Sequence, residues 1–402
     1  MKIIFLTSAI ERKAGYWRAF FLARYLSEFG HETMVICHNR TPSIKMVKKR
    51  ADNVNILLLP SLVTSRKNLF YNVLSQAITL LLHIGLNLFY ILNSDIDVLH
   101  TFDALFPQNA VPTFFFKLTG KKVFVDWDDW WGKGGSLDLF FSGAYKIAIP
   151  MLTFLEEKVP LCADACTITN NTIGQRALMT GICDKKIHII PNGANTEDIH
   201  NFDMNKARED LNLPKDAFIY TSNIKKTSFG TKTFNEINPI LLAHKHVLES
   251  KPEAKLMLMG EGGRERWIAE ARLLKINKNI IYVGYQPSRL FGKYLSSSNF
   301  FLLPLGDTIF NRARSLQRLM DYMAAGRPII TTSLPENLKI GADCCFFINP
   351  SFEPRELSEK IVYAINNPEL CETMGENALK KAQRHSWKNC ASHLEKIYTQ
   401  HL

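Results

Sequence analysis

Two arginines and one aspartate recur at helical spacing within residues 310–332, whose sequence is FNRARSLQRLMDYMAAGRPIITT. Arg314, Arg318 and Asp321 are spaced i, i+4 and i+7, which places them on one side of a helix at about 100° per residue. The opposite side of that helix is apolar and carries Leu316, Leu319, Met320 and Met323. The pattern predicts an amphipathic helix that ends at Gly326 and is followed by a short buried strand, IITT.

Arg314, Arg318 and Asp321 form a stripe of mixed charge, which suits a ligand that carries both a phosphate and a diol. Arginines near the start of a helix favour phosphate, because the first backbone N–H groups and the helix dipole attract negative charge there. Asp321 lies one turn further and repels phosphate, but its carboxylate can accept hydrogen bonds from hydroxyl groups. A pyrophosphate joined to a ribose meets both conditions. A solvated helix face with a simple Arg–Asp pair is the structural alternative, because exposed pairs are common and weak.

Strand-like and helix-like segments alternate along the chain and must position this stripe. Apolar, β-branched runs such as IIFLT, KVFVDWD and KIHIIPNG are separated by amphipathic segments such as residues 17–29 and 172–180. This order predicts βαβ units and parallel sheets. The pattern restarts after PNGANTED, so we expect two parallel-sheet domains, residues 1–195 and 196–382. Residues 383–402 form a final amphipathic helix that can pack back on the first domain.

The composition favours an anionic partner. The 402 residues carry 49 Lys and Arg against 38 Asp and Glu, a formal net charge of +11. Such an excess suits nucleic acid, a phosphorylated substrate or a membrane surface. One basic cluster has no acid within it: Arg40, Lys45, Lys48, Lys49 and Arg50.

The eight cysteines show neither CxxC pairs nor the Cys/His spacing of a zinc site. We therefore expect reduced thiols and a cytoplasmic protein. The opening residues MKIIFLTSA lack an apolar region of signal-peptide length and predict a first strand instead.

An uncharged stretch of 20 residues, Val73–Leu92, is long enough to cross a membrane. Its polar residues cluster on about a third of the helical wheel: Ser75, Gln76, Thr79, His83 and Asn87. A helix that spans lipid has no use for such a stripe, so we expect a buried or interfacial helix. Together with the basic cluster, it predicts peripheral contact with an anionic membrane surface.

Several segments together resemble a known family. RLMDYMAAGRPIITT resembles the C-terminal motif of the retaining glycosyltransferases of family 4, which have the GT-B fold. KAGYWRAFFLARYLSEFGHETMVI resembles the opening loop and helix of that family, and IIPNGANTEDI resembles its interdomain segment. LMLMGEGGRER with IIYVGY, and HSWKNCASHLEKIY, resemble two further stretches in the same order. The resemblance covers nearly the whole chain and implies an α/β protein of GT-B fold, with two Rossmann-like domains facing a cleft.

The resemblance also implies site residues. It assigns catalytic roles to Asp128 and Arg314. It assigns donor binding to Gly15, Arg18, Lys225, Lys226, Tyr285, Asn311, Arg318 and Asp321. The donor would be a nucleotide-diphosphate sugar as co-substrate, with no metal and no other cofactor.

The chain departs from the family pattern in two places that concern sugar chemistry. The family has two glutamates eight positions apart, but here Ala313 replaces the first and Asp321 the second. Where relatives have a His that touches the donor sugar, the run DWDDWW places Asp128. Its acids could also ligate Mg²⁺ or Mn²⁺, but we expect Asp128 to accept hydrogen bonds from sugar hydroxyls.

The sequence therefore predicts a retaining, metal-independent glycosyltransferase that transfers a hexosyl or N-acetylhexosaminyl group. The acceptor would be a glycan or a lipid-linked saccharide at the inner face of the membrane, and no nucleic-acid partner is expected. Two alternatives stay open. A non-catalytic GT-B binding subunit is favoured by Ala313, and a nucleotide-sugar 2-epimerase shares the fold. A Rossmann dehydrogenase is disfavoured, because no G-x-G-x-x-G follows the first strand.

Overall fold

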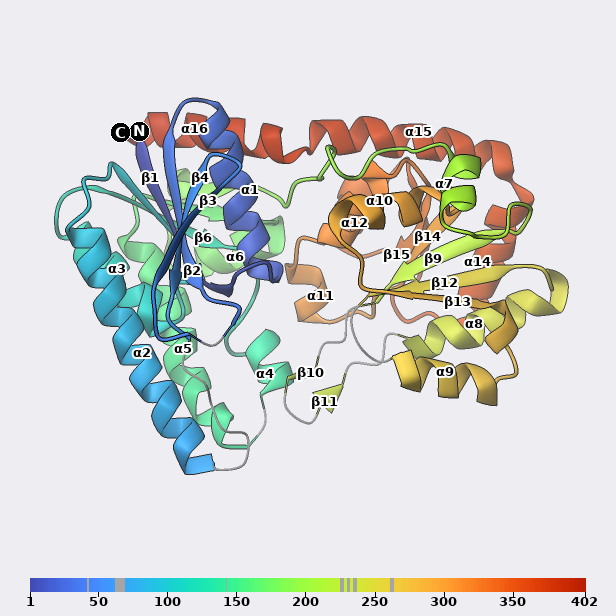
Figure 1. The fold of residues 1–402 in the computed structure, drawn as a ribbon, viewed down its shortest axis with the longest axis horizontal. Helices are drawn as coiled ribbons and strands as arrows, with labels where there is room; N and C mark the ends of the chain where they lie inside the picture. The colour runs from blue at the N-terminus through green and yellow to red at the C-terminus, as the bar shows by residue number, and fades with distance from the viewer. Residues whose placement is uncertain are drawn as a thin grey trace. The chain divides into compact units, whose positions relative to one another are not determined.

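The computed structural model describes residues 1–41, 43–61, 69–141, 143–224, 228–229, 232–233, 237–260 and 264–402. The chain divides into two compact units (Figure 1). Unit 1 comprises Met1–Asn192, Ala313–Ser315 and Trp387–Leu402. Unit 2 comprises Gly193–Arg312 and Leu316–Ser386.

Unit 1 is built on an eight-stranded sheet with the order β3-β4-β2-β1-β5-β6-β7-β8. Its strands are β1 (Lys2–Ile10), β2 (Glu32–His38), β3 (Val47–Ala51), β4 (Val54–Leu59), β5 (Val98–Phe102), β6 (Lys122–Trp127), β7 (Ala165–Ile168) and β8 (Ile187–Ile189). Neighbouring strands are parallel except β3 and β4. Asp52 and Asn53 join that hairpin with φ of 46° and 64°, the left-handed pair that a tight two-residue hairpin turn requires.

The strands of unit 1 are apolar on both faces, as parallel strands between helix layers must be. In β1, Ile3 and Phe5 face the core that includes α1 (Ala14–Glu28) and α16 (Trp387–His401). The alternate residues Ile4 and Leu6 face the other core, with α2 (Leu69–Leu92), α3 (Pro107–Lys117) and α5 (Ile149–Lys158). The remaining helical segments of unit 1 are α4 (Ser136–Phe140), η1 (Gly143–Ala148), η2 (Val159–Cys162), α6 (Asn171–Met179) and η3 (Asp184–Lys186).

The last helix completes the core of unit 1. The ring of Trp387 in α16 stacks on Phe21 of α1 with centroids 5.4 Å apart. The hydroxyl of Tyr398 lies 2.6 Å from Nδ1 of the buried His100 in β5. Residues at the end of the chain therefore cover the first strands of the sheet.

Unit 2 is built on a parallel six-stranded sheet with the order β13-β12-β9-β14-β15-β16. Its strands are β9 (Ile219–Asn223), β12 (Lys255–Met259), β13 (Ile280–Gly284), β14 (Phe300–Leu303), β15 (Ile329–Thr332) and β16 (Cys345–Ile348), with β10 (Ser228–Phe229) and β11 (Lys232–Thr233) as a separate antiparallel pair. Alternate residues again fill two cores: Leu256 and Leu258 face one, and Met257 and Met259 face the other.

Helices cover both faces of the second sheet. The segments are α7 (Met204–Asp210), α8 (Ile237–Ser250), α9 (Arg264–Leu273), η4 (Asn277–Asn279), α10 (Ser288–Ser296), α11 (Ile309–Ala313), α12 (Gln317–Ala324), α13 (Pro335–Gly341), α14 (Pro354–Asn366) and α15 (Pro368–Arg384). Residues of α8, α9 and α14 belong to one core, and residues of α10, α12 and α15 belong to the other.

The single helix predicted after residue 310 is wrong, because the chain breaks it between α11 and α12. Leu316 is extended, with φ of −80° and ψ of 98°. The Asn170 side-chain amide donates to the Ala313 carbonyl, and the Asn192 amide donates to the Ser315 carbonyl at 3.0 Å. Side chains thus take carbonyl groups that a continuous helix would bond to its own N–H groups. Arg314 lies in this break, so it does not share a helix face with Arg318 and Asp321.

Candidate active site

The carboxyl edge of the first sheet carries a group of acids. Asp103 follows β5, Asp126 lies near the end of β6, and Asp128 follows β6. Asp103 adopts a left-handed φ of 52° and accepts a 2.7 Å hydrogen bond from the Thr7 hydroxyl. Burial raises the pKa of Asp103. The parallel topology explains the grouping, because successive strands deliver their carboxyl ends to one edge.

Asp126 is held by Arg18, which α1 presents to the sheet. The Nε and Nη2 groups of Arg18 donate to the two carboxylate oxygens of Asp126, both at 2.8 Å. Its other N–H groups donate to the carbonyls of Ile190 and Pro191 and to the side chain of Asn192. All five donors are thereby engaged inside unit 1. Arg18 was predicted to bind the donor, but these contacts give it a structural role, which is to anchor Asp126 and the segment after β8.

Asp128 occupies a half-buried position at the same edge. Its Oδ1 accepts a 3.1 Å hydrogen bond from the Trp131 indole, and its carbonyl accepts one from the Thr169 hydroxyl at 2.6 Å. Burial and the neighbouring carboxylates of Asp129, Asp103 and Asp126 raise the pKa of Asp128 well above its usual range. The raised pKa favours the protonated form of this carboxyl group, which can donate as well as accept a hydrogen bond.

Glu156 and Arg176, which the sequence reasoning missed, fix the loop that carries Asp128. Glu156 accepts hydrogen bonds from the Trp127 indole and from the backbone N–H groups of Trp131 and Gly132, at 2.8–3.0 Å. Arg176 donates to both carboxylate oxygens of Glu156, at 2.9 and 3.1 Å.

The same arginine also stacks on the aromatic residues of this loop. Its guanidinium lies 4.2 Å from the ring centroid of Trp130 and 5.2 Å from that of Trp127. Gly135 lets the loop turn back tightly, because a Cβ there would lie 2.1 Å from the Trp130 carbonyl oxygen. The DWDDWWGKGG run is therefore held in place around a buried ion pair.

The space at this edge is small in the structure. A cavity of about 10 Å³ is lined by residues that include Asp103, Asp126, Asp128 and Glu156. This volume suits a water molecule rather than a sugar. Within the described residues, no group of three or more His, Cys, Asp or Glu side chains is arranged to hold a metal ion.

The carboxyl edge of the second sheet is organised by α12 and by the end of β9. Arg318 Nη1 donates to the Asn223 carbonyl at 2.9 Å, and the Asn223 N–H donates to the Tyr322 hydroxyl at 2.8 Å. The N-cap residue of α12, Leu316, makes no side-chain cap. The first turn of α12 thus presents Arg318 beside the end of a central strand, where ligands bind in open α/β sheets.

Asp321 lies on α12 one turn beyond Gln317. Its Oδ1 accepts a 2.9 Å hydrogen bond from the Gln317 amide, which also donates to the Gly193 carbonyl. Burial raises the pKa of Asp321 to about 7. Leu319, Met320 and Met323 are buried on the other side of the helix, as their spacing predicts.

Part of the second unit matches a family of known function. Residues 234–381 match the family model described as Glycosyl transferases group 1. An uncharacterized glycosyltransferase of Methanocaldococcus jannaschii is 33% identical over 80 residues, which cover 20% of this chain and 23% of the relative. The match thus spans about a quarter of that relative's length.

Two solved structures are similar over the whole chain. Sucrose-phosphate synthase from Thermosynechococcus elongatus has a TM-score of 0.74 at 15% identity, over 100% of this chain and 99% of that one. Anabaena HepE in complex with UDP-glucose has a TM-score of 0.68 at 13% identity, over 100% of both chains. The fold is GT-B, as predicted.

The other predicted residues occupy varied positions in this GT-B chain. Gly15 lies in the first turn of α1, where a Cβ would lie 3.3 Å from the Cβ of Ala9, so glycine eases the approach of the helix to β1. Tyr285 follows β13 and is 63% exposed. Asn311 in α11 is buried, and its side-chain amide donates to the Gly306 carbonyl, which precedes that helix, at 2.8 Å. Arg314 is half-buried. Lys225 and Lys226 lie outside the described residues.

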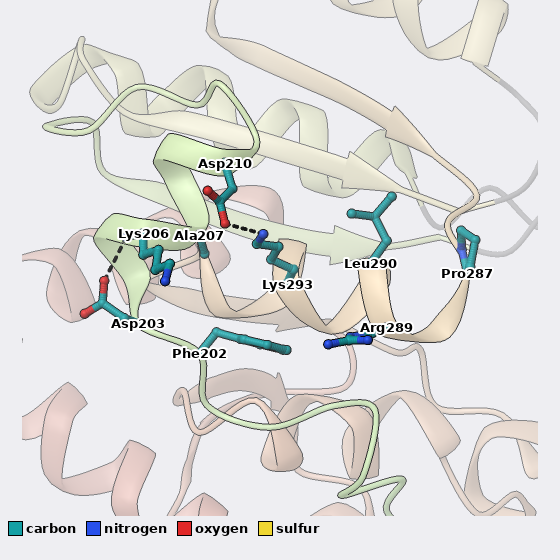
Figure 2. Close-up of a pocket in the computed structure, with 9 residues that line it drawn as sticks. All are labelled: Phe202, Asp203, Lys206, Ala207, Asp210, Pro287, Arg289, Leu290 and Lys293. Atoms are coloured by element: carbon teal, nitrogen blue, oxygen red, sulfur yellow. Dashed lines mark hydrogen bonds and ion pairs between the residues drawn. The ribbon is translucent and has the colours of Figure 1, made fainter.

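A separate cavity of about 600 Å³ lies between α7 and α10 in unit 2 (Figure 2). Phe202 lines one side, and the Lys293–Asp210 ion pair lines another. Figure 2 shows the Arg289 side chain beside the Phe202 ring. None of the predicted site residues that the structure describes lines this cavity.

Proposed function

We propose that the chain transfers a sugar from a nucleotide-diphosphate sugar to a hydroxyl group of an acceptor. The observation that carries the proposal is the match of residues 234–381 to Glycosyl transferases group 1. That stretch includes α12, which presents Arg318 and Asp321 at the carboxyl edge of the sheet. The UDP-glucose bound to the structurally similar HepE supports a nucleotide sugar as the donor.

In this proposal, α12 binds the nucleotide part of the donor. The Arg318 guanidinium stabilises the negative charge of the diphosphate, which grows when the bond to the sugar breaks. The Asp321 carboxylate accepts hydrogen bonds from hydroxyl groups, either of the ribose or of the sugar. The spacing of Arg318 and Asp321 on one side of α12 predicts this combination of phosphate binding and hydroxyl binding.

We propose that Asp128 acts on the sugar that is transferred. Its raised pKa favours the protonated form, which can donate a proton, and its ionised form can stabilise positive charge that develops on the sugar ring. We propose a retaining, metal-independent reaction, with a glycan or lipid-linked saccharide as the acceptor on the cytoplasmic side of the membrane.

The test is the release of nucleotide diphosphate from a panel of UDP-, GDP- and ADP-sugars by the purified full chain. Thermal shifts with the same nucleotides measure binding separately, because a ligand of the folded state raises its stability. We expect one nucleotide both to stabilise the chain and to be released from its sugar. Binding without release, in the presence of diverse acceptors, would identify a non-catalytic binding protein. Neither binding nor release would refute the proposal.

A further inference from the structure

Helix α2 has the opposite polarity to that of an ordinary surface helix. Three of its polar residues, Ser75, His83 and Asn87, are at most 8% exposed, whereas Thr79 is half-buried and Gln76 is exposed. Apart from Gln76, its outward side is apolar and includes Ile78, Leu81, Leu82, Phe89 and Leu92. Leu81 is 69% exposed and Phe89 is 65% exposed. A soluble protein normally buries such a side against its own core.

The inward polar residues fasten α2 to unit 1. The His83 Nε2 group lies 2.6 Å from the Pro60 carbonyl, and the Asn87 amide donates to the Gln108 carbonyl at 2.8 Å. Burial lowers the pKa of His83, which favours its neutral form. Residues Ser75–Leu92 have the length and mean hydropathy, 1.5, of a membrane span. These contacts instead describe a helix that lies on the protein and turns its apolar side outward.

Two neighbouring helical segments, α3 and η1–α5, extend the apolar side of α2. Residues of α2, α3 and α5 pack on the same face of the first sheet, and Figure 1 shows these helices together on one side of unit 1. The exposed apolar residues of α3 are Phe114, Phe115 and Leu118, and those of η1 and α5 are Ile147, Met151 and Phe154. We call these six residues and the five of α2 the apolar surface. So large a set of exposed apolar side chains marks a binding surface.

Positive charge borders the apolar surface. Lys48 in β3 places its Nζ 5.1 Å from the ring centroid of Tyr90 in α2. The segment before β3 exposes Ile44 and Met46 on either side of Lys45. Between residues 33 and 94, Asp52 is the one acid in the sequence, against the basic residues Arg40, Lys45, Lys48, Lys49, Arg50, Arg66 and Lys67.

We propose that the apolar surface and this basic border bind the surface of an anionic lipid bilayer. In this arrangement α2 lies in the plane of the interface, with its apolar side in the acyl region and the lysines and arginines at the headgroups. A second copy of the chain fits the surface less well, because an isologous contact would bring two basic borders together. The proposal rests on the exposed surface and is independent of the proposed enzymatic activity.

The experiment is co-sedimentation of the full chain with vesicles of phosphatidylcholine, with or without phosphatidylglycerol. We expect binding to the anionic vesicles that weakens as salt rises. The double variant Leu81→Gln/Phe89→Gln should lose at least tenfold in affinity. The double variant Lys45→Glu/Arg50→Glu should weaken binding to anionic vesicles and reduce its salt dependence.

Matched controls come from exposed residues of unit 2. Leu273→Gln, at a side chain that is 82% exposed, and Lys245→Glu/Lys380→Glu should bind vesicles like the unaltered chain. Circular dichroism and thermal unfolding check that each variant is folded. Failure of the unaltered chain to bind vesicles would overturn the proposal, and so would equal binding by Leu81→Gln/Phe89→Gln. A dimer that this variant dissociates would assign the surface to a second copy instead.

Discussion

The carboxyl edges of the two sheets hold their charges in different ways. At the edge of unit 1, Asp126 is paired with buried Arg18, and Glu156 is paired with buried Arg176. At the edge of unit 2, Asp321 accepts a hydrogen bond from the neutral amide of Gln317 and has a pKa of about 7. The first edge holds two of its acids in charge pairs within the chain, beside Asp128, whose pKa is raised. The second leaves a carboxyl group ready to respond to a ligand.

The largest effect should come from breaking an ion pair at the first edge. Arg18→Met leaves the carboxylate of Asp126 buried without its partner, so the free energy of unfolding should fall by about 3–5 kcal/mol. The measurement is a urea titration followed by circular dichroism. The control is Lys2→Met, which removes an exposed pair with Asp95 and should cost less than about 1 kcal/mol. Equal losses in the two variants would show that Arg18 does not anchor this edge.

Asp128 tests whether the first edge takes part in the reaction. Asp128→Ala should lower kcat about a hundredfold or more, because the group acts on the reacting sugar. Nucleotide diphosphate affinity should stay unchanged, since the proposed nucleotide contacts belong to unit 2. The control is Asp138→Ala, which alters an acid of α4 that accepts a hydrogen bond from the Gly134 N–H of the same loop. An Asp128 variant with full kcat would remove this residue from the mechanism.

A variant of Asp321 tests whether the carboxyl edge of unit 2 binds the nucleotide sugar. Asp321→Asn should weaken nucleotide-sugar binding by roughly tenfold or more, because hydrogen bonds to a charged group contribute about 1.5–3 kcal/mol. Titration calorimetry measures the change, with Glu253→Gln, an exposed acid of the same unit, as control. Unchanged affinity in both Asp321→Asn and Arg318→Ala would refute the assignment of the donor to α12.

The raised pKa of Asp321 also predicts a pH effect on stability. The folded state keeps a proton that the unfolded state releases near pH 4, so below that pH Asp321 does not lower the free energy of unfolding. As the pH rises, Asp321 lowers the free energy of unfolding by an increasing amount, which becomes constant above the folded pKa of about 7. The free energy of unfolding should therefore fall between about pH 4 and pH 7. Asp321→Asn should flatten that slope, and an identical slope in the variant would contradict the prediction.

The smallest expected effect is that of chelation. We propose that positively charged side chains, rather than a metal ion, bind the diphosphate. Activity should therefore survive EDTA. If EDTA abolishes the activity and Mn²⁺ restores it, the acids at the carboxyl edge of unit 1 bind a metal ion instead.

Local patterns predicted the fold well. Apolar, β-branched runs separated by amphipathic segments predicted the parallel sheets, because a strand buried on both faces must be apolar throughout. Helical spacing likewise predicted the buried side of α12, with Leu319, Met320 and Met323.

Features that depend on distant residues could not be predicted in this way. The break before α12 depends on Asn170 and Asn192, which lie 143 and 123 residues before their partners. The resemblance assigned Arg18 to the donor, and its partner Asp126 could not be inferred from local patterns because it is 108 residues away. The polar stripe of α2 was visible in the sequence, but its direction was decided by the carbonyls of Pro60 and Gln108, which needed donors.

The position of α16 has a consequence for synthesis of the chain. The strands of unit 1 leave the ribosome first, but α16, which covers Phe5 and Phe124 with Tyr398, follows all of unit 2. Unit 2 can fold as soon as Ser386 has emerged, while one face of the first sheet is covered by α1 but still lacks α16. The first sheet is thus completed after unit 2 although its strands are translated before unit 2, and part of its apolar face stays uncovered in that interval.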